Sequence, residues 1–367
     1  MDRDRAWSSF DLRRQNLAVV LRAIRDRPTI SRAQIATATG LTRTTVSALV
    51  ADLLDARLVR DIGAAPQATT GRPANRLVPD TGGPVGIGVD IQAGRIRCAL
   101  VDFAGRLLDP TTRQLRQIDP EAVVRETRSL VRPLLLEATA RGQVVVGMVV
   151  GVPGSVDPAR GVVREAPRLG WRDEDLAGPM AGLLEGLGAL GIDVTIRGEV
   201  ETAAASEPDR GAGLYLGGEA EPGLVVVPAP GNRAGADTGG MFGHRGTGGR
   251  GRSCRCGRRG CLVTLTGPAR ADAPDAPTVD AGRAGTELAR AVGLVLTATG
   301  LATVVVGGRV HRAETALVEA LTAELRAGAA GPLTIRRAVR GADAVVRGAG
   351  TLALAEVVRD PAGWMVT

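Results

Sequence analysis

Three of the four cysteines in the chain lie within eight residues of one another, and one of its two histidines precedes them. These four side chains follow the pattern H-x9-C-x-C-x4-C and belong to His244, Cys254, Cys256 and Cys261. Thiolates and imidazole are ligands that tetrahedral zinc prefers, and four protein ligands make a closed, structural site. We therefore expect one structural Zn2+ per chain. The alternative is a set of reduced, free thiols in a basic loop.

Arginines surround this cluster. Six of them, and no acidic residue, lie between Arg245 and Cys261. Positive charge favours the thiolate form of cysteine, which is the form that binds metal. The fourth cysteine, Cys98, is isolated in a predicted strand and is expected in the core.

A second group of polar side chains lies at the start of a predicted helix in the N-terminal region. Apolar residues spaced i, i+3, i+4 and i+7 over residues 17–24 predict a first helix. Ser31 with Gln34 predicts the capping box of a second helix, and Thr42 predicts the N-cap of a third. The pattern from Ser31 to Arg57 is typical of a helix-turn-helix, which places the start of its second helix against base edges in the DNA major groove.

DNA contacts are expected from this helix start and from a wing. Leu58–Asp61 and Arg76–Val78 are predicted to be short strands, and Gly71-Arg72-Pro73 lies in the loop between them, suited to a minor groove or backbone contact. Arginine and hydroxyl side chains can reach phosphates and base edges. The candidate DNA-binding residues are Ser31, Arg32, Thr42, Arg43, Thr44, Thr45, Ser47, Arg72, Pro73 and Arg76. The alternative is a three-helix packing module without a DNA role.

The charge distribution agrees with a basic N-terminal module. Residues 1–80 hold 13 Arg and 8 Asp and so carry five of the seven net positive charges of the 367-residue chain. A basic balance permits nucleic acid as a partner but does not prove it. All 46 basic residues are Arg, which we attribute to genomic base composition.

The composition indicates a globular protein of the cytoplasm. A hydrophobic content of 44% excludes long-range disorder, and four cysteines in 367 residues exclude a disulfide-stapled miniprotein. Residues 1–14 carry both charge signs and are not expected to be a signal peptide. The longest uncharged run, Ala291 to Gly308, is split by Gly300 and is expected to form a buried helix and a strand rather than a membrane span.

The rest of the chain alternates predicted strands with predicted helices. Turn-forming residues at 79–84 mark a boundary near residue 82. Apolar strands are expected at 85–91, 96–103 and 144–152, and the C-terminal part alternates helices and strands up to a last helix over 342–358. Such alternation implies an α/β body in which helices cover the sheets.

Gly243-His244 and the cysteine motif at 254–261 together resemble the zinc signature of the ROK family, which contains repressors, open reading frames and sugar kinases. The similarity covers roughly residues 12–364, because it includes the winged helix with Gly-Arg-Pro-Ala at 71–74 and the stretches 151–157, 166–171, 305–308 and 341–349. The resemblance implies an α/β fold with an N-terminal winged helix-turn-helix and a two-lobed, actin-like sugar-kinase body. We expect the DNA-binding head over 1–80, a first lobe over 84–199 completed by the C-terminal helix at 342–367, and a second lobe over 200–341 that carries the zinc loop.

Residues that would carry kinase chemistry depart from the family pattern. The phosphate loop D-x-G-G-T reads Asp90-Ile91-Gln92-Ala93-Gly94 here, and the second phosphate loop contains two prolines at 228 and 230. Glycines let backbone amides approach phosphate, whereas proline has no amide hydrogen. The family's catalytic Asn-Asp pair falls on Gly198-Glu199. We expect that catalysis is lost and that Glu199 is a degenerate base position.

Two interpretations of the remaining carboxylates and of the cleft stay open. We favour Asp90 as a surface or loop carboxylate without a role, and leave Glu199 undecided. The family's sugar-binding glutamates fall on Met241 and Val263, so the candidate effector cleft is more apolar. Its candidate residues are Asp90, Gly154, Glu199, Met241 and Val263. Either it binds a small-molecule effector, a sugar or sugar derivative or a less polar compound, or the lobes are only a dimerisation scaffold.

The predicted function is a ROK-type transcriptional regulator, a repressor that binds a double-stranded DNA operator as a homodimer or homotetramer. One alternative is an active ATP-dependent sugar kinase with a regulatory DNA-binding head, which ATP consumption with hexoses would reveal. Another is a ligand-independent DNA-binding scaffold, which a saturating thermal stabilisation by a metabolite would exclude.

Overall fold

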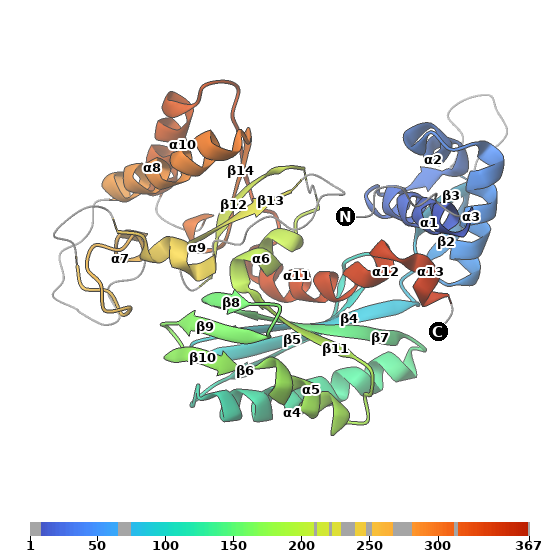
Figure 1. The fold of residues 1–367 in the computed structure, drawn as a ribbon, viewed down its shortest axis with the longest axis horizontal. Coiled ribbons are helices and arrows are strands. Elements are labelled where there is room, and N and C mark those ends of the chain that lie inside the picture. Colours follow the sequence, from blue (N-terminus) through green and yellow to red (C-terminus); the bar gives the residue numbers. More distant parts are fainter. Residues whose placement is uncertain are drawn as a thin grey trace.

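The computed structural model describes residues 9–64, 75–208, 211–219, 222–228, 239–246, 252–266, 281–311 and 315–365. Figure 1 shows three parts: a small head that contains the N-terminal helices, a first lobe around the largest sheet, and a second lobe on the other side of α6 and α11. Within the described ranges, no helix is long and apolar enough to cross a membrane.

The head is formed by three helices and a small sheet. Its helices are α1 (Ser9–Arg25), α2 (Arg32–Thr39) and α3 (Arg43–Asp55), and its strands, in the order β1-β3-β2, are β1 (Ile30–Ser31), β2 (Val59–Ala64) and β3 (Asn75–Pro79). The predicted caps are confirmed: Ser31 and Gln34 form a capping box at α2, and the Thr42 hydroxyl accepts a hydrogen bond from the Thr45 amide at α3. Between the two helices Gly40 adopts a φ of 74°, which glycine tolerates without strain.

A five-stranded sheet is the centre of the first lobe. The strand order is β11-β7-β4-β5-β6; β4, β7 and β11 are parallel, and β5 is antiparallel to β4 and β6. These strands are β4 (Pro84–Gln92), β5 (Arg95–Asp102), β6 (Leu107–Gln114), β7 (Val144–Val152) and β11 (Asp193–Gly198). Helices α4 (Pro120–Ala140) and α5 (Ala177–Glu185) cover one face, and α11 (Ala344–Ala353) covers the other (Figure 1). A small antiparallel sheet contains β8 (Ser155–Asp157), β9 (Val162–Ala166) and β10 (Trp171–Asp175).

Strand β4 has one apolar face, which belongs to the hydrophobic core, and one face that carries glycines and polar residues. Its odd-numbered residues are apolar and belong to the hydrophobic core of the first lobe: Val85, Ile87, Val89 and Ile91. Because side chains alternate along a strand, the even-numbered residues face the other side. After Pro84 they are two glycines, at 86 and 88, that contact α11, and then Asp90 and Gln92.

The second lobe contains a four-stranded sheet of order β13-β12-β14-β15. One face of the sheet packs with α8 and α10, and the other face packs with α6 and the start of α11. Its main elements are α6 (Glu199–Ala205), β12 (Gly213–Gly217), β13 (Gly223–Val227), α8 (Ala281–Thr299), β14 (Thr303–Val306), α10 (Thr315–Gly328) and β15 (Thr334–Arg337). Shorter helices are η1 (Gly239–His244), α7 (Val263–Thr266), α9 (Gly308–His311) and η2 (Gly341–Asp343).

The C-terminal helix predicted over 342–358 is not continuous, and this prediction is wrong. The segment contains two helices, α11 and α12 (Ala355–Arg359), and α13 (Pro361–Trp364) follows it. A single turn residue, Leu354, separates α11 from α12, and Leu354, Val357 and Val358 are buried in the hydrophobic core of the head. The favourable burial of these side chains against the head offsets the loss of the backbone hydrogen bonds that a continuous helix would make.

Candidate metal centre, DNA-binding surface and cleft

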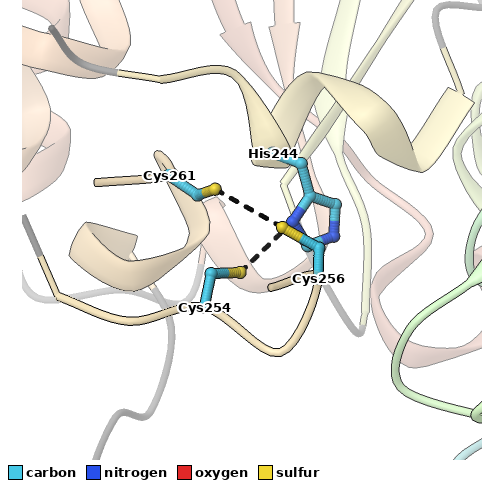
Figure 2. A group of neighbouring side chains, drawn as sticks. All are labelled: His244, Cys254, Cys256 and Cys261. Atoms are coloured by element: carbon cyan, nitrogen blue, oxygen red, sulfur yellow. Dashed lines mark hydrogen bonds between the residues drawn. The ribbon is translucent and has the colours of Figure 1, made fainter. Parts of the chain in front are cut away.

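The four predicted metal ligands come together in the second lobe. Figure 2 shows His244 from η1 facing three cysteines from the loop that follows. The ligand atoms of His244, Cys254, Cys256 and Cys261 all lie within 4.8 Å of one another. In tetrahedral zinc coordination with Zn–S bonds of about 2.3 Å, two sulfurs are separated by about 3.8 Å. The Sγ atoms of Cys256 and Cys261 are 3.7 Å apart, and Cys254 Sγ is 3.3 Å from His244 Nδ1, so the donor set fits a tetrahedral ion.

Backbone hydrogen bonds hold the cysteine loop in this shape. The amide of Cys254 donates to the carbonyl of Arg258 at 2.8 Å, and the amide of Gly257 donates to the carbonyl of Cys254 at 3.0 Å. Gly257 has a φ of 85°, a left-handed conformation that a residue with a Cβ rarely adopts. The fully buried Leu262 follows the last cysteine and anchors the loop in the core of the second lobe.

Burial opposes ionisation of the cysteines, because a thiolate inside the protein loses hydration. It raises the pKa of Cys261 to about 12 and also raises the pKa of Cys254. At Cys256 burial is outweighed by hydrogen bonds from the backbone and guanidinium of Arg258, and the pKa falls to about 7. Cys256 therefore ionises first, and a metal ion would stabilise the thiolates of the other two.

The start of α3 presents the predicted DNA-binding side chains to solvent. Arg43, Thr44 and Ser47 are exposed, whereas Val46 and Leu49 on the opposite side of the helix are buried in the head. The Thr42 hydroxyl caps the helix by accepting a hydrogen bond from the Thr45 amide, and it lies 2.9 Å from the Thr45 hydroxyl. The first turn of α3 thus combines hydroxyls, one guanidinium and the positive end of a helix dipole, an arrangement that attracts phosphate.

The other predicted DNA-binding residues lie in different surroundings. Ser31 is nearly buried, and its hydroxyl caps α2. Arg32 forms an ion pair with Asp61 of β2 at 3.5 Å, and Arg76 lies in β3 opposite Ser31. The predicted wing tip with Arg72 and Pro73 lies outside the described residues, although the two strands that bound it, β2 and β3, pair as expected.

The candidate cleft contains a buried polar network that joins β4 of the first lobe to α6. The side-chain amide of Gln92 donates to Asp90 Oδ1 at 2.8 Å and to Glu199 Oε2 at 2.9 Å. Both carboxylates are buried, with 0% and 2% of their surface exposed, and Arg95 lies 3.6 Å from Asp90. Burial raises the pKa of Asp90 to about 6, although the Gln92 hydrogen bond and the Arg95 charge favour ionisation.

The expectation that Asp90 is a surface or loop carboxylate is wrong. Asp90 lies within β4 on the side opposite the apolar residues and is fully buried. Gln92, which bridges the carboxylates of Asp90 and Glu199, was not among the predicted site residues. The alternation of β4 could have identified it, because residues 90 and 92 must lie on the same face of a strand.

The remaining candidate cleft residues lie on both lobes. Gly154 follows β7 and has a φ of 144°, and a Cβ there would lie 2.3 Å from the carbonyl oxygen of Glu165 in β9. Val263 begins α7 and is partly buried. Met241 lies in η1, with its side chain outside the described part of the chain. Of the candidate cleft residues, Asp90 and Glu199 are joined through Gln92.

Known protein families match the head and part of the body of the chain. Residues 18–77 match the MarR family, and residues 86–215 match the ROK family. The chain is 26% identical to the xylose repressor of Bacillus subtilis (strain 168) over 257 residues, which are 68% of this chain and 65% of that protein. The aligned part therefore spans slightly less than two thirds of this relative.

Solved structures that resemble the chain include a regulator and a kinase. The crystal structure of a ROK family transcriptional regulator, a homologue of the E. coli MLC protein, has a TM-score of 0.71 and 19% identity, and the match covers 97% of this chain and 99% of that chain. The ROK hexokinase from Thermus thermophilus has a TM-score of 0.56 and 25% identity, and covers 74% of this chain and 99% of its own. The predicted fold class, a winged helix-turn-helix followed by a two-lobed, actin-like body, is confirmed.

Proposed function

The chain carries a ROK family domain behind a MarR-type helix-turn-helix domain, and from this premise we propose that it is a DNA-binding transcriptional repressor. The start of α3 carries the proposal, because Arg43, Thr44 and Ser47 are exposed there on a helix whose other side is packed. A helix-turn-helix places these positions at base edges in the major groove. The name of the similar xylose repressor supports repression rather than activation.

The proposed partner is a double-stranded operator with two-fold symmetry, bound by a homodimer or by a homotetramer made of such dimers. Two-fold symmetry of the protein would place half-sites about one or two helical turns apart. The wing around Arg72 and Pro73 would contact the minor groove or backbone beside the half-site, and Arg32 and Arg76 would lie near its base. Such a regulator acts in the cytoplasm.

The experiment that tests this function measures binding to the upstream region of the protein's own gene over a range of salt concentrations. Arg43→Ala is expected to weaken binding about tenfold or more, because an arginine to a base edge contributes about 1–3 kcal/mol. If Arg43 contacts phosphate instead, the slope of log affinity against log salt falls by about one. Arg72→Ala tests the wing in the same way.

Arg290→Ala is the matched control, because it removes one exposed arginine from α8 in the second lobe, away from the head. Binding of this variant should equal that of the wild type. Unchanged binding of both Arg43→Ala and Arg72→Ala would contradict the assignment of α3 and the wing.

The proposed role of the body is regulatory. Gln92 occupies the position of a phosphate-loop glycine in family kinases, and its amide engages Asp90 and the degenerate base Glu199. This occupation supports loss of phosphoryl transfer, so we assign no enzyme activity. The cleft at Asp90, Gly154, Glu199, Met241 and Val263 would take a small-molecule effector, for which a sugar is suggested by the name of the similar xylose repressor.

We also assign Zn2+ to the cysteine cluster, as one structural ion per chain. The support is the donor set of three thiols and one imidazole at tetrahedral spacing. No reaction step involves this ion; it would hold the loop between η1 and α7 in one shape.

A further inference from the structure

A cavity of about 900 Å³ lies in the second lobe, where α8 and α10 end. The two helices lie side by side on one face of the four-stranded sheet (Figure 1). Helix α8 leads into β14 and α10 leads into β15, and these strands are parallel, so both helices end at the same edge of the sheet. Because α6 packs on the other face of that sheet, the cavity is separate from the candidate cleft.

The walls of this cavity are mostly apolar and reach the surface. Leu294 of α8 has 60% of its surface exposed, and Leu301 and Leu333, which precede β14 and β15, are partly buried. Small residues leave the space between these leucines, since a Cβ at Gly293 would meet nothing within 4 Å. A mostly apolar hollow of about 300–1,000 Å³ is typical of small-molecule sites. The cavity can therefore take the apolar body of a small ligand.

The charged side chains around the cavity favour a cation. Arg290 of α8 lies in the wall, but it already pairs with Glu287 at 3.0 Å. Glu324 of α10 also lies in the wall, where it is exposed and forms no ion pair with any residue that the structure describes. Arg326, the basic residue in the last turn of α10, lies outside this cavity and beside β15. The carboxylate of Glu324 is therefore not compensated by a neighbouring cation.

The ends of the two helices add to this negative potential. An α-helix carries a partial negative charge at its C-terminus, because its last carbonyls have no amide partner within the helix. Thr297 near the end of α8 and Gly328 at the end of α10 both line the cavity. Two helix C-termini and the Glu324 carboxylate therefore border the same apolar space.

We propose that this cavity is a second ligand site, and that it binds a small amphipathic cation with an alkyl or aromatic body and a primary ammonium group. The body would lie against Leu294, Leu301 and Leu333. The ammonium would pair with Glu324 and donate hydrogen bonds to carbonyls at the helix ends. The site goes beyond the proposed function, because it involves neither the DNA-binding residues nor the candidate cleft, and its test uses no DNA.

The ligand class is tested by titration calorimetry of the full-length protein with three probes that share an eight-carbon chain. Octylamine is a cation at pH 7, because alkylammonium groups such as that of lysine have a pKa of about 10.4. Octanol is neutral and octanoate is an anion. We expect saturable binding of one octylamine per chain, about tenfold tighter than octanol, with octanoate weaker still. Equal affinity for all three probes, or no saturable binding of octylamine, would overturn the proposal.

The place of binding is tested by Gly293→Phe, which puts a large side chain into the empty space of the cavity and is expected to abolish octylamine binding. Gly182→Phe is the matched control, because Gly182 lies in α5 of the first lobe and a Cβ there also meets nothing within 4 Å. This control should bind octylamine as the wild type does. Wild-type affinity of Gly293→Phe would place the probe elsewhere and overturn the proposal.

The charge is tested by Glu324→Gln, which retains the shape of the side chain. Octylamine affinity should fall about fivefold, while octanol affinity stays unchanged. Glu319→Gln removes an exposed carboxylate of the same helix that lies outside the cavity, and it should bind both probes like the wild type. The mass of Gly293→Phe in solution is measured as well. A smaller assembly of this variant, together with no binding of octylamine to the wild type, would assign the cavity to contact between copies and overturn the proposal.

Discussion

Asp90 is a carboxylate whose surroundings do not fully compensate its charge. One of its oxygens, Oδ1, accepts a hydrogen bond from Gln92, while Oδ2 is buried without a hydrogen-bond donor and has Arg95 at 3.6 Å. A buried charge that is incompletely paired lowers stability, and it does so only when the group is ionised.

The pH dependence of stability follows from the pKa of Asp90, which burial raises from 3.8 to about 6. Between these values the folded protein binds more protons than the unfolded chain, so this group's contribution is fully present below pH 3.8 and is lost as the pH rises through about 6. The shift corresponds to at most about 3 kcal/mol. Asp90→Asn should therefore stabilise the protein more at pH 7.5 than at pH 4.5, as measured by urea unfolding.

Asp193→Asn, at the exposed first residue of β11, is the matched control for this measurement. Its effect on the free energy of unfolding should be small at both pH values. Equal effects of Asp90→Asn at pH 4.5 and at pH 7.5 would contradict the assignment of a raised pKa.

At the scale of the element, the first turn of α3 has two separable tasks. The Thr42 hydroxyl caps the helix, whereas Thr44 is exposed and makes no cap. We expect Thr42→Ala to lower stability by about 1 kcal/mol, the usual cost of losing such a cap. Thr44→Ala should leave stability unchanged and weaken operator binding. Thermal unfolding and DNA binding of both variants measure this, and equal stability of the two would argue against the cap.

The shape of the cysteine loop depends on its own backbone hydrogen bonds and also on His244, which lies ten residues before the first cysteine of the loop. Its local hydrogen bonds orient three thiols, and His244 reaches them from η1 (Figure 2). We predict that metal analysis finds about one zinc ion per chain in the wild type and none in Cys256→Ser, because three remaining ligands bind zinc weakly. The thermal midpoint should fall with the zinc content.

Cys98→Ala is the control for the zinc experiment, since Cys98 is buried in β5 outside the cluster. This variant should keep its zinc. Wild-type protein that is metal-free as purified, or that keeps its stability after the metal is removed by a chelator, would refute the zinc assignment.

For the whole molecule, the two-lobed body has a fold that also occurs in kinases, and the proposed role of this chain is regulatory. The fold is shared with a ROK hexokinase. We propose that the bridge through Gln92, at the position where the family resemblance places a phosphate-loop glycine, prevents phosphoryl transfer. We expect no ATP consumption above background with a panel of hexoses and amino sugars. Turnover that Glu199→Ala abolishes would overturn this prediction and favour the kinase alternative.

The same arrangement explains which parts of the site could be predicted from sequence. The elements of the head could be predicted because caps, helix periodicity and turn glycines depend on only a few neighbouring residues, as at Ser31 and Thr42. The cluster of candidate metal ligands could be predicted because three of its members lie within eight residues and because few side chains bind zinc. Assignment of the cleft residues depended on family resemblance, since Asp90 and Glu199 are more than a hundred residues apart.

The sequence by itself determined the local elements, the ligand set and the α/β character of this protein, because these depend on residue types and short spacings. Only the tertiary structure decided that Asp90 is buried, that Gln92 bridges it to Glu199, and that the last helices complete the core of the head. The physical reason is that burial and hydrogen-bond partners depend on which distant segments pack together. Here α11 packs closely against β4 and α6 through glycines, whose positions in the sequence do not reveal their partners. Leu354, Val357 and Val358, which follow α11, pack in the core of the head.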